Sequence, residues 1–170
     1  MGATLEISNE QFARLTKHLA AGPDEQLAFL LARWRQDVAS VTDVRLIEAR
    51  SFDIQTPWHL SLSDEERAAV IKWAHDSDAS LIEAHVHRGS DLAEFSGSDW
   101  NGLDAFVRHV WWRLRHRPYI ALVFADSGFD GLVWRTDPAT PETLAGLVVG
   151  DRPADLPTGR SLPRRGWFDD

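Results

Sequence analysis

Cysteine is absent from this 170-residue sequence, and basic residues are scarce relative to acidic ones. Without cysteine, disulfide bonds, thiolate metal ligands and cysteine nucleophiles are all excluded, so any chemistry must use histidine, carboxylate or hydroxyl groups. The 18 Lys and Arg residues against 26 Asp and Glu residues give a formal net charge of −8. This charge argues against nucleic-acid binding, because no large basic surface is available to meet phosphates.

Long apolar runs and leader-like segments are also lacking. No apolar stretch approaches the length that spans a bilayer, and no signal-peptide pattern opens the chain. The length suits one domain with a sizeable core, and 44% of the residues are hydrophobic. These features predict a soluble, cytoplasmic protein that makes no use of a membrane.

The hydrophobic pattern alternates between strand and helix periodicity, which predicts an α/β fold with helices packed on a mixed central sheet. Helices are expected after Ser8, Ser63 and Ser98, each interpreted as an N-cap residue. Residues 36–43 and 57–60 are interpreted as irregular connections. Strands are expected at Thr4–Ile7, Leu27–Leu31, Val44–Phe52, Ser80–His87, Tyr119–Ala125 and Gly131–Trp134.

The composition changes after residue 136, because five of the eight prolines follow it. Residues 1–136 are therefore expected to form the main domain. Residues 137–170 are interpreted as a C-terminal extension that packs on the same domain or is mobile, with a helical segment over 141–149.

The segment from His85 to Asp99 contains the residues that most clearly indicate a functional site. His85 and His87 lie two residues apart on an expected strand, so both side chains project from one face. Asp99 follows near a helix start, three residues after Ser96. Two imidazoles and a carboxylate can supply three ligands to a tetrahedral zinc ion, with the fourth position left to water. Each part has a simpler explanation alone, since Asp99 suits helix capping, but the combination favours a metal site.

The roles of several further polar residues can be interpreted in more than one way. Glu25 follows a Gly-Pro break and opens an apolar strand, so it is either an exposed loop carboxylate or a general base with a raised pKa. Glu83 shares the face of the histidines, either as a hydrogen-bond partner of a ligand or as a solvated carboxylate at a sheet edge. His59 is a candidate to line a substrate groove, and Trp100 is a candidate to contact substrate.

Taken together, the glutamate, the apolar strand after it, the His-x-His pair and the Ser-x-x-Asp interval resemble the JAMM motif of zinc-dependent isopeptidases. The resemblance implies that residues 1–136 form a catalytic domain with the MPN (JAB-like, cytidine-deaminase-like) fold, with Zn²⁺ held by His85, His87 and Asp99. It further implies that Glu25 is the general base and that Ser96 stabilises the oxyanion.

The implied activity is a zinc metalloprotease that cleaves after the C-terminal glycine of a ubiquitin-like protein. Bacterial members of the family often accompany conjugation systems with E1- and E2-like enzymes, some of them antiviral. This chain departs from the motif at Val86 (usually serine or threonine), Arg88 (usually proline) and Ala28 (commonly glycine), and eight residues rather than seven separate His87 from Ser96. None of these departures removes an implied ligand or the implied base.

Two alternatives remain open from the sequence. One is a non-catalytic MPN module that binds a ubiquitin-like protein or scaffolds a complex. The other keeps zinc-dependent hydrolysis but acts on small peptides or on adducts of a sulfur-carrier protein.

Overall fold

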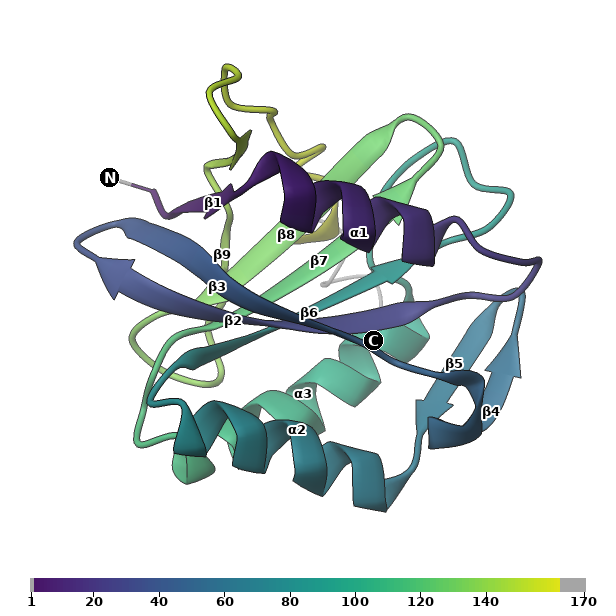
Figure 1. The fold of residues 1–170 in the computed structure, drawn as a ribbon, viewed down its shortest axis with the longest axis horizontal. Coiled ribbons are helices and arrows are strands. Elements are labelled where there is room, and N and C mark those ends of the chain that lie inside the picture. Colours follow the sequence, from purple (N-terminus) through teal and green to yellow (C-terminus); the bar gives the residue numbers. More distant parts are fainter. Residues whose placement is uncertain (1, 163–170) are drawn as a thin grey trace.

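A mixed eight-stranded sheet with helices on both faces organises the chain in the computed structural model, which describes residues 2–162 (Figure 1). The strand order is β10-β1-β3-β2-β6-β7-β8-β9. Strands β6 and β7 pair in parallel, whereas β2 pairs antiparallel with both of its neighbours. The main-sheet strands are β1 (Thr4–Ile7), β2 (Leu27–Arg35), β3 (Val38–Leu46), β6 (Ser80–Val86), β7 (Tyr119–Ala125), β8 (Gly128–Trp134), β9 (Glu142–Thr143) and β10 (Gly146–Val149). The predicted α/β class is confirmed.

Three α-helices cover this sheet. Helix α1 (Asn9–Leu19) lies on one face, and α2 (Asp64–Asp76) and α3 (Gly97–Arg113) lie on the other (Figure 1). The predicted capping box of Ser8 and Gln11 is present at the start of α1. Ser63 caps α2 as predicted, accepting a hydrogen bond from the backbone amide of Glu66. None of the helices within residues 2–162 is both long and apolar enough to cross a membrane.

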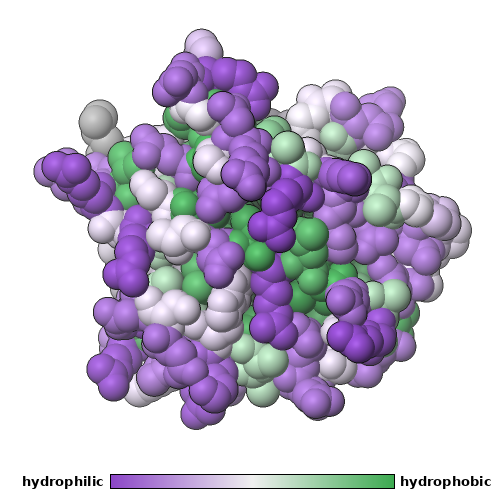
Figure 2. Space-filling view, viewed as in Figure 1, coloured by the Kyte–Doolittle hydropathy of each residue, from purple (hydrophilic) through white to green (hydrophobic). Residues whose placement is uncertain are grey.

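Both faces of β2 are buried, and they contribute to two separate cores. Leu27 and Phe29 belong to the core beneath α2 and α3, whereas Ala28 and Leu30 belong to the core beneath α1. This alternation follows from the two-residue period of a strand. A strand that is covered on both faces has a continuous run of apolar residues in its sequence, as β2 does. Figure 2 shows a mainly hydrophilic outer surface, with apolar side chains visible between the two helical layers.

The strand that follows β2 begins earlier than predicted. Residues 36–43 were expected to form a loop, but β3 starts at Val38 and the turn is tight, with Gln36 in the left-handed region at φ 55°. The strand predicted over 44–52 ends at Leu46 and is followed by a short 3-10 helix, η1 (Ala49–Ser51). The polar residues of β3 that suggested a loop lie at partly or fully exposed positions of the strand.

A second, two-stranded sheet replaces the irregular link predicted at 57–60. Strands β4 (Phe52–Thr56) and β5 (His59–Leu62) form an antiparallel hairpin whose turn holds Pro57 and Trp58. The hairpin lies beside the N-terminal end of α2 in Figure 1. It matters for the site because the backbone amide of Glu25 donates a hydrogen bond to the carbonyl of Thr56, at 2.9 Å.

The helical segment predicted over 141–149 is wrong. These residues form β9, which pairs with β8, and β10, which pairs in parallel with β1. The chain after β10 stays attached to the domain, because the buried carboxylate of Asp130 accepts hydrogen bonds from the backbone amides of Gly159 and Ser161. The part of the predicted extension beyond Leu162 lies outside the described residues.

Candidate metal centre

The side chains of His85, His87 and Asp99 converge in the folded chain. His85 and His87 lie at the end of β6, and Asp99 lies in the first turn of α3. Nε2 of His85 is 3.1 Å from Nε2 of His87, which is itself 3.0 Å from Oδ2 of Asp99. Oδ1 of Asp99 is 3.5 Å from Nε2 of His85. The expectation that these three side chains share one space is met.

The spacing of these donor atoms suits a tetrahedral ion. With zinc–ligand bonds of about 2.0–2.1 Å, neighbouring donors in a tetrahedron lie about 3.3 Å apart. The separations of 3.1 Å between the two imidazole nitrogens and 3.0 Å from His87 to Oδ2 of Asp99 are close to this value, and Oδ1 of the same carboxylate lies 3.5 Å from His85. Two imidazole nitrogens and a carboxylate oxygen also form a donor set that zinc accepts. The described chain therefore contains a possible metal-binding triad, whose members were all identified from the sequence.

Ser96 and Asp99 also hold the start of α3. The Ser96 hydroxyl accepts a hydrogen bond from the Asp99 amide at 3.1 Å, and the Asp99 carboxylate accepts one from the Ser96 amide at 2.7 Å. Ser96 is thus the N-cap, and the prediction that Ser98 caps this helix is wrong because the helix begins two residues earlier, at Gly97. The capping explanation of Asp99 and its role as a possible ligand are compatible, since the same carboxylate serves both.

Glu25 is buried near the triad and is not an exposed loop residue. Only 5% of its surface is accessible. It lies two residues before Leu27, which pairs with His85 across β2 and β6, so the sheet register carries Glu25 towards the histidines. The side-chain amide of Gln55 donates a hydrogen bond to the Glu25 carbonyl at 3.0 Å, which adds to the Thr56 contact. The sequence left two interpretations of Glu25 open, and its burial excludes the exposed loop carboxylate.

Electrostatics at the centre follow from burial and close opposite charges. Burial raises the pKa of Glu25 above its ordinary value, against the lowering effect of the nearby histidines. Burial alone would lower the pKa of His85. The charge of Asp99, the hydrogen bond to it and the nearby carboxylates of Glu83 and Glu25 together outweigh burial and raise the pKa to about 9. The same histidine charges hold the pKa of Asp99 well below its usual range, despite its burial. The centre thus holds an imidazolium–carboxylate pair whose proton a divalent cation would have to displace.

The side chain of Arg88, which follows β6, connects this part of the chain to the segment that precedes Glu25. Its guanidinium donates hydrogen bonds to the backbone carbonyls of Asp24 at 3.1 Å, Leu19 at 2.7 Å and Ala21 at 3.0 Å. From the sequence, Arg88 was visible only as a departure from the motif. Its role was missed because main-chain carbonyls more than 60 residues away leave no signal in the sequence.

Replacing Arg88 with alanine should therefore loosen Glu25 without removing a ligand. For the amide hydrolysis that the JAMM resemblance implies, we expect Arg88→Ala to lower kcat by about tenfold with no change in zinc content, because small misplacements of a catalytic group are costly. Arg33→Ala is the matched control. Arg33 lies near the far end of β2 from Glu25, and its guanidinium also donates a hydrogen bond to a distant backbone carbonyl, that of Ser77. Equal activity of the two variants would contradict the positioning role.

The centre opens into a cavity of about 620 Å³. His59 lines it, as suggested from the sequence. Glu83 also lines it, and its Oε2 accepts a hydrogen bond from the Tyr119 hydroxyl at 2.6 Å, so it is not a solvated edge carboxylate. Trp100 was expected near substrate, but it is buried and packs against Phe95, on the core side of α3.

No protein-family model matches the chain, and no curated protein matches it. Solved structures do match its fold. One of them is the solution structure of protein DSY2949 from Desulfitobacterium hafniense, which is 15% identical to this chain with a TM-score of 0.58. The match covers 87% of this chain and 94% of that protein. At this level of identity the likeness concerns the fold alone: the chain has a mixed α/β fold similar to that of DSY2949.

Proposed function

We propose that this protein is a zinc-dependent amide hydrolase of the JAMM type with the MPN fold. The observation that carries the proposal is the gathering of Glu25 and Ser96 with the triad of His85, His87 and Asp99 at one end of a cavity. These are the positions to which the JAMM resemblance assigns the base, the oxyanion donor and the metal ligands.

Zinc held by the triad would lower the pKa of a water molecule towards ~7 and polarise the carbonyl of a substrate. Glu25 accepts a proton from the water as the water oxygen bonds to the carbonyl carbon. Its raised pKa suits this role, because a stronger base is a better proton acceptor while it remains ionised. Glu25 then returns the proton to the leaving nitrogen as the C–N bond breaks, which yields an amine and a carboxylic acid that loses its remaining proton to solvent at neutral pH.

Ser96 is suited to stabilise the oxyanion. Its oxygen already accepts the hydrogen bond from the Asp99 amide, which leaves its own O–H free to donate. The hydroxyl also lines the cavity that a substrate would enter. The N-cap position fixes the serine backbone, so the donor is held in place before substrate arrives.

The substrate proposed from the resemblance is an amide or isopeptide bond after the C-terminal glycine of a ubiquitin-like protein, with E1- and E2-like enzymes of the same system as further partners. The burial of Glu25 and the completeness of the triad favour a hydrolase over the non-catalytic module. The volume of the cavity, about 620 Å³, keeps small-peptide and sulfur-carrier adducts as a second candidate class.

Cleavage of fluorogenic amides by the zinc-loaded protein tests the proposal. The probes are ubiquitin carrying a C-terminal aminocoumarin amide and a panel of dipeptide aminocoumarin amides. We expect at least one probe to be cleaved, with activity lost on chelation and restored by zinc. A protein that binds zinc and cleaves none of the probes would contradict the hydrolase and leave the binding module.

A further inference from the structure

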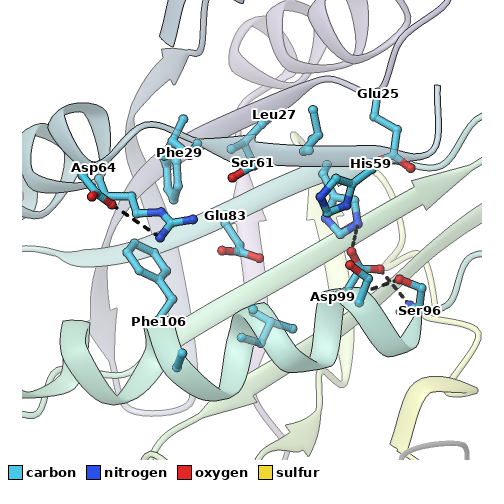
Figure 3. A pocket seen from close by; sticks show the side chains of 18 of the residues that line it. Glu25, Leu27, Phe29, His59, Ser61, Asp64, Glu83, Ser96, Asp99 and Phe106 are labelled. Atoms are coloured by element: carbon cyan, nitrogen blue, oxygen red, sulfur yellow. Dashed lines mark hydrogen bonds and ion pairs between the residues drawn. The ribbon is translucent and has the colours of Figure 1, made fainter. Parts of the chain in front are cut away.

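The cavity extends well beyond the candidate metal centre. In Figure 3 the side chains of Ser96 and Asp99 lie at one end, Glu83 lies in the middle, and Phe29 and Phe106 lie farther along. A volume of about 620 Å³ is in the range of pockets that enclose a small ligand. A glycine beside the scissile bond has no side chain to place there, so cleavage after a terminal glycine alone would leave this space empty.

The walls of the extended part are mainly apolar and come from four elements. They comprise Leu27 and Phe29 on β2, Leu62 on β5, Ile71 on α2, and Leu103 and Phe106 on α3. Apolar walls recognise an apolar occupant, because its burial removes both surfaces from water. The Glu83 carboxyl, already bonded to Tyr119, lies among them. Polar groups of Ser61, Asp64, Arg67 and His109 also line the cavity.

Small, solvent-exposed residues of the two helices lie at the opening of the cavity. Ala68 on α2 and Ala105 on α3 line it, as does Gly102. Gly102 is the sixth residue of α3, an interior position where glycine is less favourable than alanine. A Cβ built on it would have no heavy atom within 4 Å, so close packing does not explain the glycine. A side chain longer than that of alanine would project into the open space.

We propose that this cavity is a substrate subsite for a large, mainly apolar group, either aromatic or branched aliphatic, within one residue of the scissile amide. The inference rests on the proposed function, because it takes the carbonyl of the substrate to lie at the triad. Gly102 lies at the opening of the subsite, and the walls from β2, α2 and α3 surround the bound group.

Binding of two matched hydroxamates to the zinc-loaded protein, measured by calorimetry, tests this inference without relying on turnover. Acetohydroxamate offers the zinc-binding group alone, and 3-phenylpropanohydroxamate adds a phenyl ring on a short linker. We expect the phenyl compound to bind at least about tenfold more tightly, because burial of an aromatic ring in an apolar pocket gives a gain of this order.

Gly102→Leu should remove this preference and leave the affinity for acetohydroxamate unchanged. The variant is expected to fold, since leucine is a better helix former than glycine. Gly102→Ala is the control and should keep the preference, because its methyl group meets open space.

Three outcomes are distinguishable. A phenyl preference that Gly102→Leu abolishes supports the subsite. Equal affinity for the two hydroxamates in the wild-type protein overturns the subsite and leaves the hydrolase standing. A protein that takes up no zinc overturns the proposed function, and the subsite fails with it.

Discussion

Glu25→Gln is expected to lower kcat for amide hydrolysis by about 100- to 10,000-fold, the range associated with loss of a general acid or base. The glutamine side chain has nearly the same size and keeps the contacts of the backbone with Thr56 and Gln55. It cannot accept the proton of the attacking water. Steady-state kinetics with a cleavable amide probe measures the change.

Zinc content separates the chemical role of Glu25 from a structural one. Because Glu25 is not a member of the triad, Glu25→Gln should bind as much zinc as the wild-type protein. Glu48→Gln is the control, since Glu48 is an exposed carboxylate paired with Arg50. Appreciable cleavage by a zinc-loaded Glu25→Gln protein would exclude Glu25 as the base.

Ser96→Ala is expected to lower kcat by about 100- to 1,000-fold, because it removes a hydrogen bond that forms to the oxyanion in the transition state. The same change removes the N-cap of α3 and should reduce the free energy of unfolding by about 0.5–2 kcal/mol. Kinetics and thermal unfolding on the same preparation measure both effects.

Ser8→Ala separates these two effects. Ser8 caps α1 in the same capping-box arrangement but lies outside the cavity. We expect Ser8→Ala to lose a similar amount of stability and to keep its activity. If the two alanine variants lose activity equally, the effect of Ser96 comes from destabilisation, and its role at the oxyanion is wrong.

The sequence predicted the parts of the centre that depend on local geometry. The common face of His85 and His87 follows from the two-residue period of a strand, and the position of Ser96 one turn before Asp99 follows from the period of a helix. These relations involve residues close in sequence, so they can be derived without knowing the fold. The capping box that Ser96 and Asp99 form was not predicted, because Ser98 was expected to cap this helix.

Contacts between distant segments could not be predicted in this way. Strand β10 pairs in parallel with β1 across more than 130 residues, and its surroundings are rich in proline, which favoured a loop or short helix over a strand. The hydrogen bonds of Arg88 to the chain before Glu25 and the burial of Trp100 also depend on packing. The role of Gly102 follows only from the open space beside it.

The central claim is that His85, His87 and Asp99 hold one zinc ion, and elemental analysis of the purified protein tests it most directly. The comparison uses the wild-type protein, His85→Ala and His59→Ala, because His59 lines the same cavity but does not belong to the triad. We expect about one zinc per chain in the wild-type and His59→Ala proteins and none in His85→Ala. The absence of zinc from all three proteins after reconstitution, or equal zinc in all three, would contradict the account.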